Sequence, residues 1–315
     1  MSRRHVVLVS YGEPPVPDFG GQFAYSFRIL LNLTRIIAAI PAPLLPLIAL
    51  ARARSRRKTW RARGYGSPLE TITQAQAASV RARLQETTGT GWTAHVAYEF
   101  RNPQLETVLR AIPADEAVFV VPMYAADSAF THALSRQTAM RVNGSRRTPA
   151  RVLEAIDAGL LAAISADHVR KQVSGGGSEA GSWALVLAAH GTLLEPSKPI
   201  ETGRENTERL CRLLEERLAP EFGMVIHGWL NHTRGGRWTE PAMDQALRQV
   251  FDAGYRKTVY FPYGFLADNA ETQIEGPAIA GGLPGLDVRF LPCLNDSAAL
   301  ADAIAAQIQA ISPAP

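Results

Sequence analysis

Cysteine is scarce in this chain, and its scarcity limits the chemistry available. The 315 residues include two cysteines, Cys211 and Cys293. Two thiols cannot supply the four thiolates of an iron–sulfur cluster, and so few thiols in a long chain are typical of a reducing compartment. The apolar run Val6–Val9 is too short for the core of a signal peptide and ends in a turn. We therefore expect a cytoplasmic protein without an iron–sulfur cluster.

Several motifs of common enzyme classes are also missing. The sequence has no P-loop, no G-x-G-x-x-G after a strand and no G-x-S-x-G elbow. The motifs typical of nucleotide-binding proteins and of esterases are therefore absent, which argues against both functions. With 46% hydrophobic and 20% charged residues, the composition is that of a globular protein.

Acidic residues are absent from a strongly basic stretch. The basic residues are Arg52, Arg54, Arg56, Arg57, Lys58, Arg61 and Arg63. The preceding segment, Ile29–Leu50, is apolar, but Asn32, Arg35 and three prolines interrupt it, which argues against a membrane span. Two interpretations remain open for residues 29–63: contact with the anionic inner face of a membrane, or a buried helix followed by a solvated basic turn. No nucleic-acid-binding module accompanies the charge.

A glycine- and serine-rich segment, Ser174–Ser182, predicts a flexible linker. It separates an amino-terminal half, residues 1–173, from a carboxyl-terminal half, residues 183–315.

The halves resemble each other. VVLVSYGEP at 6–14 corresponds to ALVLAAHGTLLEP at 184–196, and VFVVPMYAADSAFT at 118–131 corresponds to VYFPYGFLADNAET at 259–272. In each half an Asp-x-Ala-x-Thr segment opens a helix, and we expect its aspartate, Asp127 or Asp268, to be the N-cap.

Strands alternate with helical patterns along both halves. Helices are expected near residues 71–86, 104–111, 149–164, 205–218, 242–251 and 297–311. This alternation predicts an α/β protein of two similar doubly wound parallel-sheet domains with a cleft between them. Ligands of such sheets bind at the carboxyl ends of the strands. Tyr11 and His190, which end the first strand of each half, should therefore face each other across one cleft.

The residues expected around this cleft suit acid–base chemistry. A histidine opposite acidic groups can abstract protons or bind a divalent metal transiently. His190, Glu271 and Tyr11 each have a more common structural interpretation when taken alone. Their coincidence at repeat-related strand ends is what favours a functional site.

The chain resembles the ferrochelatases over nearly its whole length. The matching segments are VSYGEP, GYGSPLETITQAQA at 64–77, VPMYAADSAFT at 121–131, AAHGTLLEP, WLNHTRGGRWTEP at 229–241 and YGFLADNAETQIE at 263–275. The resemblance places the family's catalytic histidine on His190 and its catalytic glutamate on Glu271. It implies insertion of ferrous iron into a porphyrin, protoporphyrin or coproporphyrin, in haem biosynthesis. Iron stays ferrous, so no prosthetic group is implied.

The resemblance also implies roles for residues around this pair. The incoming metal would meet His190 and Glu271, with Tyr11 and Asp268 as further candidates. The residues expected to bind the porphyrin are Tyr11, Arg28, Ser67, Tyr124, Ser128 and Trp229.

Three departures from the family pattern indicate a divergent member. Asn269 stands where ferrochelatases usually have a histidine, the segment after His190 lacks the family's tyrosine and aspartate, and Leu230-Asn231-His232 replaces glutamine–serine–arginine. Three alternatives therefore stay open. They are a non-catalytic tetrapyrrole-binding paralog, a cobalt or nickel chelatase acting on another tetrapyrrole with His232 in its cleft, and a two-domain protein that binds a small polar solute.

Overall fold

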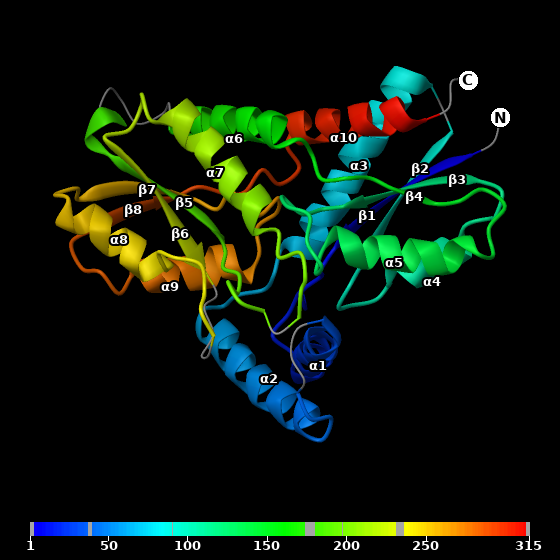
Figure 1. Cartoon of the computed structure of the whole chain (residues 1–315), viewed down its shortest axis with the longest axis horizontal. Helices are drawn as coiled ribbons and strands as arrows, with labels where there is room; N and C mark the ends of the chain where they lie inside the picture. The colour runs from blue at the N-terminus through cyan, green and yellow to red at the C-terminus, as the bar shows by residue number, and fades with distance from the viewer. Residues whose placement is uncertain are drawn as a thin grey trace.

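The structure, a computed structural model, describes residues 3–36, 40–89, 91–173, 180–196, 198–230 and 236–312. It contains two four-stranded parallel sheets flanked by helices (Figure 1). The α/β architecture of two similar halves predicted from the sequence is confirmed. Residues 174–179 of the predicted linker, together with Asn231 and His232, lie outside the described residues.

The two sheets have the same topology. In the first, the order is β2-β1-β3-β4, and in the second it is β6-β5-β7-β8. The strands are β1 (Arg4–Ser10), β2 (Trp92–Tyr98), β3 (Ala117–Pro122), β4 (Arg151–Val152), β5 (Ala184–His190), β6 (Met224–Leu230), β7 (Lys257–Phe261) and β8 (Asp287–Phe290). The central strands are continuous apolar runs because helices cover both faces of a parallel sheet. Val6 to Val9 in β1 are accordingly 0% exposed.

The helices follow the predicted alternation. They are α1 (Phe19–Ile36), α2 (Leu44–Ala62), α3 (Leu69–Thr88), α4 (Leu105–Ala111), α5 (His132–Asn143), α6 (Ala158–Val173), α7 (Arg204–Leu218), α8 (Met243–Asp252), α9 (Gly276–Ala280) and α10 (Ala298–Ile311). A 3-10 turn, η2, spans Ala180–Ser182, and a π-helical turn, η3, spans Glu271–Glu275. The helix expected over residues 149–164 is wrong at its start. Residues 151–152 form β4 because they pair with β3, and α6 begins only at Ala158.

The last helix of each half packs on the other half. In Figure 1, α6 packs across α7 of the second half, and α10 packs across α3 of the first. One hydrophobic cluster consequently contains Val6 and Leu8 of β1 together with Leu185 and Leu187 of β5. This shared core fixes the position of one sheet relative to the other.

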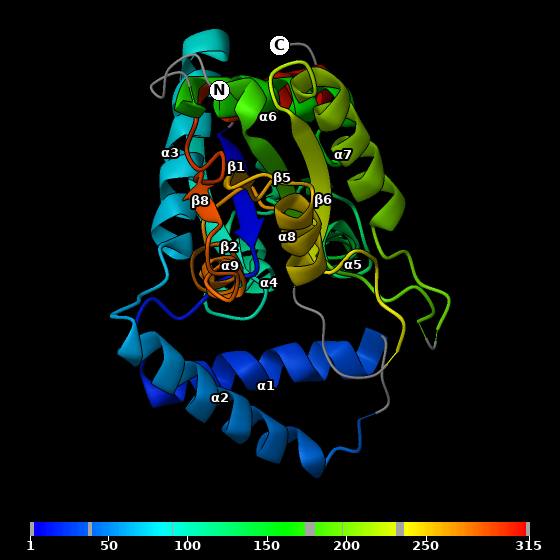
Figure 2. The ribbon, with the colours of Figure 1, turned by 90° about the vertical axis from the view of Figure 1, so that its left-hand side faces the viewer.

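Helices α1 and α2 form a hairpin outside the two sheets (Figure 2). The hairpin has a small core of its own around Leu30, Leu45 and Ala49. Its base is attached to the second half, where Trp60 packs against Ala270 and Ile274. None of the helices in the described ranges is long and apolar enough to cross a membrane.

Because the halves share a core, we expect the protein to unfold in one cooperative transition. Ile304, on α10, is 1% exposed and belongs to the shared cluster. Ile304→Ala should lower the free energy of unfolding by about 2–5 kcal/mol, since it leaves a cavity between the halves. Ile311, 40% exposed on the same helix, provides the matched control, and Ile311→Ala should change stability by no more than about 0.5 kcal/mol.

Urea unfolding followed by far-UV circular dichroism and tryptophan fluorescence measures both variants. Separate transitions for the two probes in the wild type, or equal stability of Ile304→Ala and Ile311→Ala, would contradict the shared core.

Candidate functional site

His190 is the last residue of β5, and its side chain is 48% exposed. Its Nδ1–H donates a hydrogen bond to the carbonyl oxygen of Gly191 at 2.7 Å. A carbonyl oxygen accepts only from an N–H, so Nδ1 carries the hydrogen and the lone pair of the neutral ring is on Nε2. This Nε2 lies 3.8 Å from Oε2 of Glu271. The structure thus brings together the histidine and the carboxylate that the sequence predicted to act together.

Glu271 begins the π-helical turn η3, and its side chain is 17% exposed. Turns of this rare type are frequent at functional sites. The turn is fixed by Asn269, which is 1% exposed. Its Oδ1 accepts a hydrogen bond from the Glu271 N–H at 2.8 Å, and its Nδ2 donates to the Ala267 carbonyl oxygen at 2.9 Å. Asn269 therefore orients the backbone that carries the catalytic candidate.

The prediction that Asp268 caps this turn is wrong. One carboxylate oxygen of Asp268 accepts from the Cys293 N–H and the other accepts from Nδ2 of Asn295, each at 2.9 Å. These two bonds attach the residue to the loop before α10. The capping oxygen comes instead from Asn269, the next residue in the chain.

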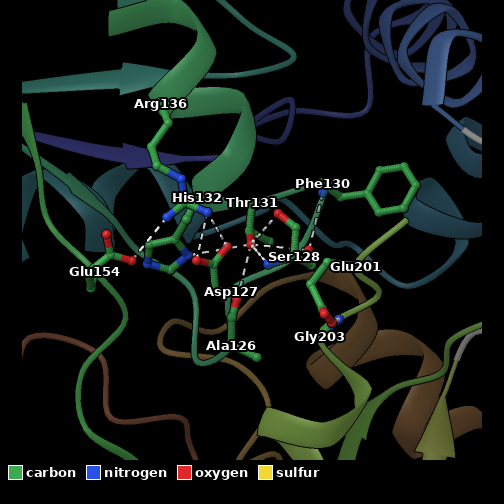
Figure 3. Close-up of polar contacts among 10 residues, drawn as sticks. All are labelled: Ala126, Asp127, Ser128, Phe130, Thr131, His132, Arg136, Glu154, Glu201 and Gly203. Carbon is green, nitrogen blue, oxygen red and sulfur yellow. Dashed lines mark hydrogen bonds and ion pairs between the residues drawn. The ribbon is translucent and has the colours of Figure 1, made fainter. Parts of the chain in front are cut away.

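The corresponding turn of the first half has the same hydrogen bonds (Figure 3). The Ser128 N–H donates to Oγ1 of Thr131 at 2.8 Å, as the Asn269 N–H does to Oγ1 of Thr272 at 3.1 Å. The Phe130 N–H donates to Oγ of Ser128 at 3.2 Å. By this correspondence Phe130 occupies the place of Glu271. The repeated turn therefore holds a carboxylate in one half and an aromatic ring in the other.

Asp127 is not the N-cap of its turn either, so this prediction is also wrong. Both of its oxygens accept from Nη2 of Arg136, at 2.9 and 2.7 Å, and Nη1 of Arg136 donates to Glu154 at 3.0 Å (Figure 3). His132 lies fully buried beside this cluster, and burial lowers its pKa to about 4. The imidazole is therefore neutral near pH 7, which suits a structural role.

Tyr11 follows β1 and approaches the site from the first half. Its hydroxyl oxygen is buried and has no hydrogen-bonding partner among the described residues. Burial raises the pKa of this phenol well above its usual value, and the negative charges of Glu13 and Glu271 add to the shift. Tyr11 thus presents a neutral hydroxyl close to the carboxylate of Glu271.

A cavity of about 300 Å³ lies between the α1–α2 hairpin and η3. Glu271 and Glu275 line it from η3, whereas Arg52, Arg56 and Trp60 line it from α2. The sequence placed these arginines in the basic cluster but did not assign them to the site. The resulting cavity has carboxylates on one wall and guanidinium groups on the other.

Several predicted porphyrin-binding residues have other partners and are not among the residues that line this cavity. Oγ of Ser67 donates to Glu13 at 2.7 Å, and Nη1 of Arg28 donates to the Phe100 carbonyl oxygen at 3.3 Å. Ser128 belongs to the turn described above. Trp229 is 2% exposed and packs on the ring of His227, with 4.1 Å between centroids.

Tyr124 resembles Tyr11 in having a buried hydroxyl, which lies beside the buried carboxylate of Glu99. It follows β3 at the carboxyl edge of the first sheet. Burial raises the pKa of its phenol well above the usual value, so this hydroxyl too is neutral.

No group of three or more His, Cys, Asp or Glu side chains in the described ranges is arranged to hold a metal ion. His190 and Glu271 form a pair of candidate ligands. Two protein ligands leave open the other positions around a divalent ion, for groups of a second molecule.

Solved structures with the same fold include several chelatases. A multi-domain protein from Deinococcus radiodurans, described as similar to chelatases, superimposes with a TM-score of 0.57 at 17% identity. The match covers 98% of this chain and 55% of that one. CbiX, the terminal enzyme for biosynthesis of sirohaem in denitrifying bacteria, gives 0.56 at 15% identity, covering 98% and 99%. SirB from Bacillus subtilis, solved with Fe³⁺, gives 0.53 at 12% identity, covering 98% and 94%. At these identities the likeness shows the two-domain chelatase fold alone.

Sequence relatives indicate the family more specifically. A ferrochelatase of Synechococcus sp. (strain RCC307) is 26% identical over 311 residues, which cover 94% of this chain and 79% of the relative. The ferrochelatase of Parasynechococcus marenigrum (strain WH8102) is 26% identical over 293 residues, which cover 86% and 72%. The family model for ferrochelatase matches residues 3–311. With this match and the geometry above, the chain belongs to the ferrochelatase family, as a divergent member.

Proposed function

We propose that this protein is a metal chelatase that inserts ferrous iron into a porphyrin. The observation that carries the proposal is the pair formed by His190 and Glu271, with 3.8 Å between Nε2 and Oε2. Of the two, Glu271 lines the cavity. Family membership and the chelatase fold support metal insertion into a tetrapyrrole. The choice of iron and of a porphyrin rests on the ferrochelatase relatives.

His190 is proposed as the base that accepts protons from the ring. A free-base porphyrin carries two pyrrole N–H protons, and both must leave as a divalent metal enters. Nε2 of His190 carries the lone pair of the neutral ring, because Nδ1–H donates to the carbonyl oxygen of Gly191. Imidazole gains and loses protons near neutral pH, and the carboxylate of Glu271 stabilises the imidazolium that forms. Glu271 then provides the next acceptor along the route of the proton.

The incoming metal, a substrate of the reaction, is proposed to meet the same pair before it reaches the ring nitrogens. A carboxylate and an imidazole are both suitable ligands for Fe²⁺. Tyr11 approaches from the other half, where its neutral hydroxyl can contact the opposite side of the ring or the metal. Asp268 is left out of this scheme, because both of its oxygens accept structural hydrogen bonds.

Helix α2 is proposed to bind the periphery of the ring. Arg52 and Arg56 line the cavity opposite Glu271. Their guanidinium groups complement the carboxylates that porphyrins carry at their edge, and arginine binds carboxylates in a bidentate manner. Trp60 lines the same cavity with an apolar ring surface. Protoporphyrin and coproporphyrin both carry such carboxylates, so both are proposed substrates.

Replacing either member of the acid–base pair should slow metal insertion strongly but preserve ring binding. We expect His190→Ala and Glu271→Gln each to lower kcat by about 100-fold or more, as is usual for a group that transfers a proton. Glu275→Gln removes another carboxylate from the same cavity and should retain at least about a third of kcat. The assay follows the porphyrin absorption spectrum in the presence of Fe²⁺.

Two outcomes of this assay would favour the alternatives. Tight porphyrin binding without turnover in the wild type would indicate a tetrapyrrole-binding paralog. Faster insertion of Co²⁺ or Ni²⁺ into another tetrapyrrole would indicate a different chelatase. Full activity of both His190→Ala and Glu271→Gln would reject the mechanism.

We further propose that the outer face of α2 rests on an anionic membrane. Positions 44, 47, 51, 54, 58 and 61 recur every three or four residues, form one face of the helix and are exposed. This face begins with Leu44 and Leu47, which are 45% and 62% exposed, and continues with Arg54, Lys58 and Arg61. Apolar side chains followed by cations match the chemistry of an acidic lipid surface.

Sedimentation with lipid vesicles tests this contact. We expect binding to vesicles of phosphatidylserine and phosphatidylcholine, little binding to phosphatidylcholine alone, and at least about a 10-fold loss in Leu47→Asp combined with Lys58→Glu. Met140→Asp, at a residue 73% exposed on α5, serves as the control and should bind like the wild type. Equal binding of all variants would reject the proposal.

A further inference from the structure

Glu13 is a buried carboxylate that connects the first half to the catalytic turn of the second. It lies two residues after Tyr11 and is 1% exposed. Its Oε2 accepts a hydrogen bond from Oγ of Ser67 at 2.7 Å and another from the N–H of Ala270 at 3.0 Å. Ala270 immediately precedes Glu271. The carboxylate therefore contacts the backbone of the residue that precedes the proposed catalytic group.

Neighbouring groups offset the cost of burying this charge. Burial raises the pKa of Glu13, whereas Arg56, Ser67 and the Ala270 N–H oppose that rise. Nη2 of Arg56 lies 4.0 Å from Oε1 of Glu13. The guanidinium of Arg56 is itself held over the ring of Tyr25, 4.9 Å from its centroid. An unpaired buried carboxylate would be strongly destabilising, so the contacts of Glu13 with Ser67, Ala270 and Arg56 together stabilise its buried position.

Two glycines allow the segment around Glu13 to take its position. Gly12 has a φ of 71°, and a Cβ there would lie 2.8 Å from Cβ of Tyr98. A Cβ on Gly66 would lie 2.5 Å from the Pro15 carbonyl oxygen, so the loop of Ser67 can approach only because this residue is glycine. The backbone conformation at Gly12 consequently fixes the positions of Tyr11 and Glu13 relative to each other.

We propose that Glu13 is a positioning residue that sets the separation between the wall carrying Tyr11 and the wall carrying Glu271, acting through the Ala270 N–H. The inference rests on the proposed function of His190 and Glu271. Its main effect is expected on the chemical step, because the hydrogen bond from the Ala270 N–H is short and holds the turn of the base pair directly. Its contact with Arg56 on the wall that binds the ring is the longer ion pair of 4.0 Å, so ring binding should change less. A displacement of about 1 Å at such a site can cost about 100-fold in rate.

Substitutions at Glu13 test this role. In Glu13→Ala the Ala270 N–H loses its acceptor, and we expect kcat to fall by about 10- to 100-fold while the dissociation constant for the porphyrin changes less than about 3-fold. In Glu13→Gln the side-chain amide oxygen can still accept from Ala270, so kcat should recover to within about 5-fold of the wild type. Fluorescence quenching measures ring binding, and the absorption assay measures kcat.

A readout independent of activity accompanies these rates. Amide hydrogen exchange at Ala270 and Glu271 should accelerate at least about 10-fold in Glu13→Ala and less in Glu13→Gln, because the lost acceptor releases the turn locally. Asn143→Ala is the control. It also removes two hydrogen bonds, those to Ala150, but in the first half and outside the catalytic turn. It should leave exchange at Ala270 and kcat unchanged.

The outcomes separate this inference from the proposed function. If the wild type inserts no metal into any ring, the proposed function fails, and unchanged exchange at Ala270 in Glu13→Ala would then overturn the positioning role as well. Accelerated exchange with a wild-type kcat would overturn it directly. So would a fall in kcat that is equal in Glu13→Ala and Glu13→Gln, or one that is matched by the loss of ring binding.

Discussion

The site depends on one constraint, the fixed conformation of the turn that carries Glu271. Asn269 holds this turn from within the second half, and Glu13 holds it from the first. Trp60 of the hairpin packs against the same turn at Ala270 and Ile274. A carboxylate stabilises a protonated imidazole strongly only at short range. The distance of 3.8 Å between Glu271 and His190 is set by the conformation of this turn, and therefore depends on all three contacts. The first half thereby contributes to the geometry of the proposed catalytic pair, which resides in the second.

The duplicated fold explains why the supports come from both halves. Equivalent strands β1 and β5 end in equivalent places, and the two turns share their threonine and N–H contacts. The chemistry nevertheless differs, with Tyr11 and Phe130 in one half where the other has His190 and Glu271. A flat ring bound between them would meet aromatic groups on one side and an acid–base pair on the other. Under the proposed mechanism, proton removal and metal entry would both occur at the face of the ring that meets His190 and Glu271.

Much of the fold follows from the sequence, because the repeated strands and helices have regular hydrophobic patterns. His190 and Glu271 could be named because each stands at a strand end or helix start that the pattern locates. The prediction that the two aspartates are N-caps is wrong because their hydrogen-bonding partners lie outside the Asp-x-Ala-x-Thr segments. Asp127 binds Arg136 on the next helix, and Asp268 binds residues 293 and 295. The role of Glu13 could not be predicted from the sequence, since Ser67 and Ala270 become its neighbours only in the folded protein.

The measurement that tests the central claim most directly is a crystal structure of the wild-type protein with a metal-free porphyrin bound. We expect the ring between Tyr11 and His190, with Nε2 of His190 within about 3.5 Å of a pyrrole nitrogen, the separation of a reactive complex. The ring carboxylates should lie at Arg52 and Arg56. A porphyrin bound away from His190, or one whose nitrogens face neither His190 nor Glu271, would contradict the proposed mechanism.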